Sequence, residues 1–153
     1  VLHHFDASPF AEKTRKIFGI KKIAWRSVII PMAPPKPDLL ALTGGYRRTP
    51  VMQIGADIYC DTRLIARVID RLCPEPPLFG AGPVSAAASH FWSGAEFFAP
   101  GAALSLHENR DYIAKDVADD RRAYFNFLDF DRFEEDAPHF RSQLRAFARL
   151  IDR

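Results

Sequence analysis

The proline-rich segment PEPPLFGAGP at residues 74–83 constrains the fold of this chain more than any other feature of the sequence. It contains four prolines and two glycines, and proline both lacks a backbone N–H and fixes φ. The segment can therefore form neither a helix interior nor a central strand, which predicts a linker. We expect a first domain at residues 1–75, a linker at 76–83 and a second domain at 84–153. The 153 residues suffice for two small domains that share an interface.

The first thirty residues read as a strand, a helix and a second strand. The segments at 1–5 (VLHHF) and 23–30 (IAWRSVII) have the apolar, aromatic and β-branched content of strands. Between them, residues 8–19 have helical spacing of apolar side chains. Ser8 is the expected N-cap, Pro9 suits the first turn and Gly19 can stop the helix. Such a unit is normally parallel and right-handed.

The next forty residues add a short helix, a hairpin and a longer helix. A proline-rich loop at 31–37 leads to a short helix at 38–42. Strands are expected at 50–55 and 57–60, with Gly55 near the turn of a hairpin. An amphipathic helix follows at 61–73. The order βαβ then ββα predicts an α/β domain with a mixed four-stranded sheet and helices on both faces.

The residues after the linker contain no convincing strand, so the second domain is expected to be all-α. Helices are predicted at 84–99, where Pro100-Gly101 should kink or end the helix, at 111–128 and at 136–153. The last helix carries an apolar stripe and has no stop signal before Arg153. We therefore expect either that the native chain continues, so that this helical domain is incomplete, or that a partner covers the stripe. The stripe comprises Phe140, Leu144, Phe147, Leu150 and Ile151.

Composition excludes several classes of function. The formal net charge is only +2 and the basic residues are scattered, so no nucleic acid is expected as a partner. No apolar run approaches the roughly 18 residues of a membrane span, and no signal peptide is recognisable. Cys60 and Cys73 do not form a secreted disulfide framework, and a cytoplasmic protein is expected. No metal site is predicted, because His3 and His4 would lie on opposite faces of a strand.

The dipeptide Thr49-Pro50 directly precedes a predicted strand, where proline cannot donate to the ladder. Its use there is explained if the bond is cis, because X-Pro tolerates the cis form far better than other peptide bonds. A cis bond would turn the backbone N–H and C=O of Thr49 outward, so that an extended peptide could pair with them as an extra strand. The alternative is an ordinary trans proline at the edge of a strand.

Two predicted helix starts carry hydroxyl or carboxyl side chains that suit ligand binding. At Asp61-Thr62 the hydroxyl and the helix N-terminus could bind a carboxylate, and the aspartate an ammonium group, as in the head group of an α-amino acid. The hydroxyl of Ser8 could stabilise a ligand thiolate. Nothing is placed to activate Ser8 as a nucleophile. The alternative at both helix starts is simple capping.

Together, the segments SPFAEKTR, RTPV and CDT, in this order and spacing, resemble the cytosolic glutathione transferase family. The resemblance covers about residues 1–80. It implies a thioredoxin-like N-terminal domain followed by an all-helical domain, with glutathione as co-substrate and no metal. By the same resemblance Ser8 activates the thiol, and Thr49 and Pro50 bind the cysteinyl part. Asp61 and Thr62 would then hold the γ-glutamyl group, and Lys36 or Arg48 the glycyl carboxylate.

The implied activity is conjugation of the glutathione thiolate to an electrophilic, largely apolar compound. Such an enzyme would serve detoxification as a cytoplasmic homodimer. The alternative is a transferase-like module without catalysis that serves binding or assembly, because a fold does not guarantee an activity. The chain departs from the family in its shorter helical domain. Because Ser8 is not a cysteine, the sequence also argues against the thiol–disulfide branch of the superfamily.

Overall fold

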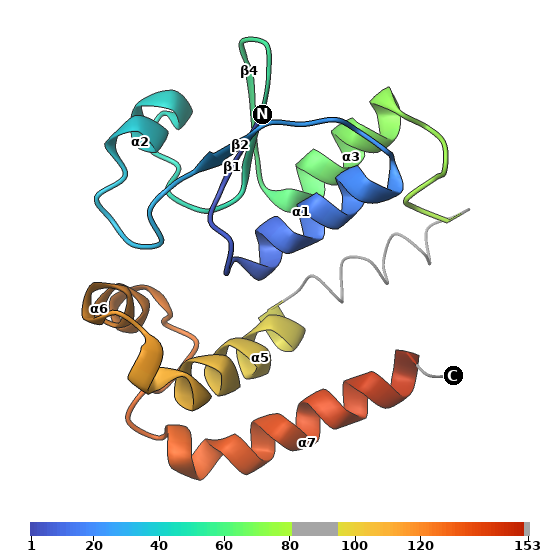
Figure 1. Cartoon of the computed structure of the whole chain (residues 1–153). Coiled ribbons are helices and arrows are strands. Elements are labelled where there is room, and N and C mark those ends of the chain that lie inside the picture. The colour runs from blue at the N-terminus through green and yellow to red at the C-terminus, as the bar shows by residue number, and fades with distance from the viewer. Residues whose placement is uncertain (81–94, 152–153) are drawn as a thin grey trace. The chain divides into compact units, whose positions relative to one another are not determined.

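The computed structural model describes residues 1–80 and 95–151, apart from the side chains of residues 95, 96, 150 and 151 (Figure 1). The chain divides into two compact units, Val1–Gly80 and Ala81–Arg153, which we describe separately. Most of the helix predicted at 84–99 lies outside the described residues.

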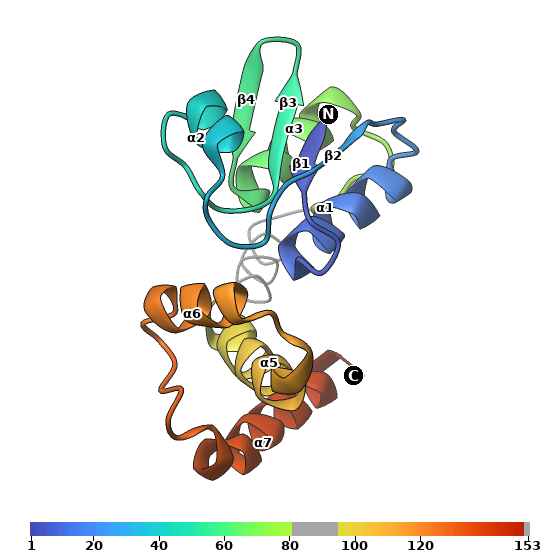
Figure 2. The same cartoon turned by 60° about the vertical axis from the view of Figure 1, so that its left-hand side comes forward.

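The first unit contains four strands and three helices in the predicted order. The strands are β1 (Leu2–His4), β2 (Ser27–Ile29), β3 (Val51–Ile54) and β4 (Asp57–Cys60), and the helices are α1 (Pro9–Ile20), α2 (Pro37–Thr43) and α3 (Thr62–Leu72). The strand order is β2-β1-β3-β4 (Figure 2). β1 and β2 are parallel, whereas β3 is antiparallel to both β1 and β4. The predicted mixed four-stranded sheet is therefore confirmed.

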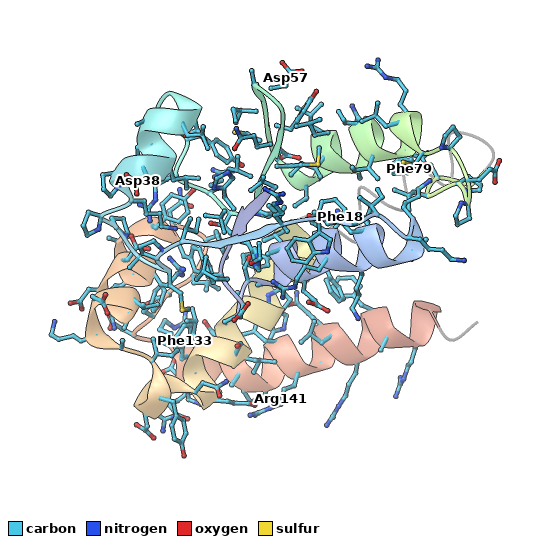
Figure 3. The ribbon with its side chains drawn as sticks, turned by 45° about the horizontal axis from the view of Figure 1, so that its top comes forward. Phe18, Asp38, Asp57, Phe79, Phe133 and Arg141 are labelled. Carbon is cyan, nitrogen blue, oxygen red and sulfur yellow. The ribbon has the colours of Figure 1, made fainter. Side chains whose placement is uncertain are left out.

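Successive side chains of a strand point to opposite faces of the sheet, so apolar side chains lie on both faces. Helices cover both faces. Met52 belongs to a buried cluster with Leu2 on β1, Phe18 on α1 and Ile65 on α3. Figure 3 labels Phe18 of this cluster on α1. The preceding residue, Val51, belongs to a second cluster on the other face of the sheet. The first face thus holds α1 and α3, which pack beside each other.

The second cluster lies on the face that α2 covers. It contains Val51 and Leu39, the one buried residue of α2. Ile30, which follows β2, completes it. Gly44 ends α2 with a left-handed φ of 66°, a conformation that glycine adopts without steric cost. The two clusters confirm that helices cover both faces of the sheet.

The register of the strands brings three chain segments to one edge of the sheet. Leu2 pairs with Met52 and His3 with Val51, while Val51 also pairs with Cys60. The end of β1, the start of β3 and the end of β4 are therefore neighbours. Because α1 follows β1 and α3 follows β4, both helices begin at this edge.

A buried lysine ties the end of α3 to α1. The side chain of Lys21, the C-cap of α1, is fully buried. Its Nζ donates to Asp70 Oδ1 at 2.6 Å and to the carbonyl oxygens of Cys73 at 2.6 Å and Pro76 at 2.5 Å, with the carbonyl of Pro74 at 3.3 Å. The ammonium group therefore serves as the common donor for the chain that leaves α3.

In its described residues the second unit is helical and contains no strand. It comprises α5 (Ala95–Glu108), a 3₁₀ turn η1 (Arg110–Tyr112), α6 (Lys115–Tyr124) and α7 (Phe133–Ile151). Together with the first unit, this confirms the predicted fold class of an α/β domain followed by a helical one. None of the described helices is long and apolar enough to cross a membrane.

Three helix boundaries differ from those predicted. α5 continues through Pro100 and Gly101, because packing against α7 outweighs the hydrogen bond that proline removes. The segment at 111–128 is helical only in η1 and α6. α7 begins at Phe133, before the predicted start, since the acidic side chains of its first turn favour a helix N-terminus.

The aromatic residues of the second unit form ring contacts rather than a fully buried core. Phe98 lies 5.9 Å from Phe125 and 6.0 Å from Phe127, centroid to centroid, and Phe127 is 43% exposed. Phe97 of α5 contacts Phe147 of α7 at 5.9 Å, so α5 covers part of the predicted apolar stripe. Phe125, Phe130, Phe133 and Phe140 are likewise only half-buried.

Candidate functional site

Ser8 caps α1 at the edge of the sheet where β1 ends. Its Oγ accepts a hydrogen bond from the N–H of Ala11 at 3.2 Å, and its own N–H donates to the carbonyl of Phe5 at 3.2 Å. Only 3% of its surface is exposed. Since the cap uses Oγ as an acceptor, the hydroxyl proton is still available for an acceptor on a ligand.

The Thr49-Pro50 bond is cis, which confirms the prediction for this dipeptide. Pro50 is fully buried, and continuing the strand register puts it between His4, the last residue of β1, and Asp61, which follows β4. The Oγ1 atom of Thr49 is buried and has no hydrogen-bond partner among the described residues. A buried hydroxyl without a partner is uncommon in proteins, which marks this peptide as an unusual position.

Asp61 and Thr62 begin α3 at the same edge. Asp61 Oδ1 accepts from the N–H of Arg63 at 2.6 Å, so the predicted cap is present. Asp61 also has a φ of 76°, which is uncommon for a residue other than glycine. Such backbone outliers cluster at ligand-binding and active sites. Asp61 is exposed, whereas Thr62 is buried, so the carboxylate lies at the surface of the site and the hydroxyl lies within it.

Two cationic residues near Asp61 were missed by the sequence analysis. Burial lowers the pKa of the Lys13 ammonium most, the charge of Arg63 lowers it further, and the charge of Asp61 raises it. These charge interactions show that Lys13 of α1 lies close to the start of α3. No sequence signal could have shown this, because it depends on how α1 packs beside α3. Two positive charges therefore add to the attraction of this helix N-terminus for anions.

The two predicted ligands of the glycyl carboxylate differ in burial. Lys36 precedes α2 and is only 5% exposed, and its Nζ lies 5.5 Å from the ring centroid of Phe5. This contact brings Lys36 close to the end of β1 and hence to the loop that carries Ser8. Arg48 is exposed and immediately precedes Thr49 in the chain. Lys36 is thus near this edge through its contact with Phe5, and Arg48 through its place next to Thr49 in the chain.

Neither thiol chemistry of the chain itself nor a metal is suggested by the described residues. Cys60 is half-buried and unpaired, and burial raises the pKa of its thiol. A raised pKa keeps the group a thiol, which is less reactive than a thiolate. Within residues 1–80 and 95–151, no group of three or more histidine, cysteine, aspartate or glutamate side chains could hold a metal ion.

Comparisons with known proteins identify similar chains. Residues 2–77 match the family described as "Glutathione S-transferase, N-terminal domain". The chain is 25% identical over 89 residues to glutathione S-transferase U4 of Arabidopsis thaliana, an alignment that covers 58% of this chain and 40% of that protein. It also resembles the crystal structure of a GST-like protein from Pseudomonas syringae, with a TM-score of 0.57 and 50% identity over 69% of this chain and 38% of that one. The chain thus spans about two fifths of the length of these two relatives.

Proposed function

Because the chain belongs to the glutathione transferase family, we propose that its first domain binds glutathione and that the protein conjugates the glutathione thiolate to an electrophilic, largely apolar compound. The observation that carries this proposal is the convergence of three features at one edge of the sheet. They are the hydroxyl of Ser8, the cis Pro50 and the Asp61-Thr62 pair at the start of α3. Each suits a different part of one small peptide.

The start of α3 binds the γ-glutamyl head group in this proposal. The carboxylate of Asp61 pairs with the ammonium group, and the hydroxyl of Thr62 donates to the carboxylate. The N-terminus of α3 and the nearby charges of Lys13 and Arg63 add electrostatic attraction for that carboxylate. The alternative of simple capping accounts for one oxygen of Asp61 and leaves its uncommon φ without a role.

The peptide backbone of glutathione pairs with Thr49 as an added strand, which directs the cysteinyl thiol toward Ser8. The Ser8 hydroxyl donates to the sulfur and favours the thiolate, so the thiol loses its proton to solvent at a lower pH. The burial of Ser8 strengthens this hydrogen bond, because the local dielectric constant is low. The thiolate then attacks the electrophilic carbon, forming a C–S bond as the leaving group departs with its electron pair.

Three further parts of the proposal come from the sequence and from the resemblance to the family: the residue that binds the glycyl carboxylate, the domain limits and the oligomeric state. Lys36 or Arg48 holds the glycyl carboxylate in this proposal. We propose domain limits of 1–75 and 84–153, with a linker at 76–83. The protein is proposed to act as a cytoplasmic homodimer in detoxification.

Two substitutions test the proposal in the full chain, with 1-chloro-2,4-dinitrobenzene as a generic electrophile. Thr62→Ala removes a hydrogen bond to an ionised group, worth about 1.5–3 kcal/mol. It should raise the Kd for glutathione by roughly ten- to a hundredfold and leave kcat unchanged, because the contact is equal in ground and transition states. Ser8→Ala should lower kcat more than affinity and raise the pKa of the bound thiol toward about 8.5. Folded fraction is checked first by circular dichroism.

A glutathione-binding or assembly module without catalysis is the second candidate. It is favoured by the fact that Ser8 Oγ and Asp61 Oδ1 are both engaged as helix caps. Retention on immobilised glutathione without any turnover would support this second candidate. If Ser8→Ala, once shown to be folded, changes neither kcat nor the thiol pKa, then Ser8 is only a cap and the catalytic proposal fails.

A further inference from the structure

We propose that Arg15 is a positioning residue for Ser8, which it holds in place through the loop between β1 and α1. The inference rests on the proposed function, because it assigns Arg15 to the thiol-activating site. Arg15 lies two turns into α1, and its side chain is 20% exposed. None of the sequence motifs pointed to it.

The guanidinium group of Arg15 contacts three different partners. Its Nη2 donates to the carbonyl oxygen of Asp6 at 3.0 Å, and its Nη1 lies 2.9 Å from His4 Nδ1. Its Nε and Nη2 lie 2.8 and 2.7 Å from the same carboxylate oxygen, Oε2, of Glu12. The planar group thus links the end of β1, the following loop and the first turns of α1. Lysine could not make all of these contacts at once.

The contact with His4 settles the protonation of a buried imidazole. Arginine can only donate, so Nδ1 of His4 must accept, and the proton of the neutral ring lies on Nε2. That Nε2–H donates to Ser27 Oγ at 2.8 Å, which joins β1 to β2. Burial and the charge of Arg15 lower the pKa of His4, which agrees with a neutral ring. The ring of Trp25 also packs edge-on against the His4 ring, with 5.6 Å between the ring centroids.

The loop that Arg15 holds is the one that ends at Ser8. The Ser8 N–H donates to Phe5 O, and the Asp6 carbonyl accepts from Arg15. Of the residues between β1 and Ser8, only Ala7 lies outside these two anchors. A hydroxyl stabilises a thiolate only at hydrogen-bond distance, so a small shift of this loop weakens the interaction. Arg15 therefore acts on the chemistry through the position of Ser8 and without touching glutathione.

Lys16 provides a matched control on the same helix. It also pairs with Glu12, at 3.3 Å from Oε1, but its side chain is 72% exposed. Among the described residues Lys16 pairs with Glu12, which lies on α1 itself, so Lys16→Met removes a charge next to Arg15 and spares the loop. Hydrogen bonds from Arg15 and from Lys16 are the two largest causes of the lowered pKa of Glu12, so each variant perturbs that carboxylate.

The test compares Arg15→Met and Lys16→Met in the full chain. Four quantities are measured: amide exchange at Ser8, the Kd for glutathione, kcat with 1-chloro-2,4-dinitrobenzene and the pKa of the bound thiol. In Arg15→Met, exchange at the Ser8 amide should rise by about tenfold, which corresponds to the loss of one hydrogen bond. Turnover should fall by up to about a hundredfold and the thiol pKa should rise, while glutathione affinity changes little. Lys16→Met should match the unmodified protein in all four.

The outcomes separate this inference from the proposed function. If the unmodified protein shows no turnover, the proposed function fails, and amide exchange alone then decides whether Arg15 holds the loop. If the unmodified protein is active and folded Arg15→Met has the same kcat and thiol pKa, the inference is overturned. If Arg15→Met does not fold, Arg15→Lys replaces it. Arg15→Lys keeps the positive charge but loses the guanidinium group with its several donors. Unchanged kcat, thiol pKa and Ser8 amide exchange in that variant would equally overturn the inference.

Discussion

Replacing Lys21 by methionine is predicted to destabilise the first unit by about 3 kcal/mol at neutral pH. The side chain of Lys21 is fully buried, and methionine has nearly its length but no donor. The substitution therefore removes a common hydrogen-bond donor while the apolar stem of the side chain keeps its packing. Lys21→Met therefore measures the contribution of one buried ammonium group, which has no role in the proposed function.

The magnitude follows from the groups that lose their partner. Removing one member of a buried ion pair usually costs about 3–5 kcal/mol, because the other charge stays buried and unpaired. The side chain of Asp70 is 22% exposed and keeps a hydrogen bond from the N–H of Leu78 at 2.9 Å, so water and this donor reduce its cost. The carbonyl oxygens of Cys73 and Pro76 also lose a charged donor. We therefore expect the lower end of the range.

The loss should depend on pH with a definite sign. The hydrogen bond from Lys21 is the largest cause of a lowered pKa at Asp70. A carboxyl group whose pKa is lower in the folded state stabilises that state above its unfolded pKa, here near 3.8, and the stabilisation is lost as the pH falls through the folded value. The difference in stability between the unmodified protein and Lys21→Met should therefore be complete at pH 7 and shrink below pH 3.8.

The assay is urea unfolding followed by tryptophan fluorescence. The sequence has two tryptophans, so a Trp92→Phe background leaves Trp25 as a probe of the first unit alone. Lys16→Met, on the exposed side of α1, serves as the control and should cost less than about 0.5 kcal/mol. A loss below about 1 kcal/mol in Lys21→Met, or a loss that is as large at pH 3 as at pH 7, would refute the reasoning.

Three further predictions concern packing, backbone and surface charge, each measured by urea unfolding at pH 7. Ile65→Ala should cost about 2–5 kcal/mol, because this fully buried side chain leaves a cavity between α3 and the sheet; a smaller cost would mean that the site collapses. Gly44→Ala should cost about 1 kcal/mol from its φ of 66° alone, since no atom lies within 4 Å of the added Cβ. Glu108→Gln should cost under about 1 kcal/mol, as its pair with Arg141 is exposed; a larger loss would contradict this.

Local sequence determined most of the first unit. The cap at Ser8, the turn at Gly55, the cis bond before Pro50 and the cap at Asp61 all follow from residue types and their neighbours. Such features depend on backbone geometry and on hydrogen bonds a few residues apart, which a single sequence displays directly. The order of strands and helices then limits the sheet to very few topologies.

The helix boundaries of the second unit could not be predicted as well from the sequence. Pro100 reads locally as a helix end, yet α5 passes through it and packs against α7. Most helical stability in a folded protein comes from tertiary packing, so a local breaker can be overruled. At α6 the error is the reverse: the predicted helix at 111–128 extends further than α6 itself.

The sequence by itself predicted candidate residues for binding a thiol peptide, namely Ser8, Thr49-Pro50 and Asp61-Thr62. Only the tertiary structure decided that the register of β1, β3 and β4 brings them to one edge. It alone also showed that Arg15 donates to the Asp6 carbonyl, in the loop before Ser8, and that Lys21 donates to Asp70 of α3. The physical reason is the distance in the chain over which the contacts act. Caps and turns are set by neighbouring residues, whereas these contacts join different elements and exist only once the sheet and helices have packed.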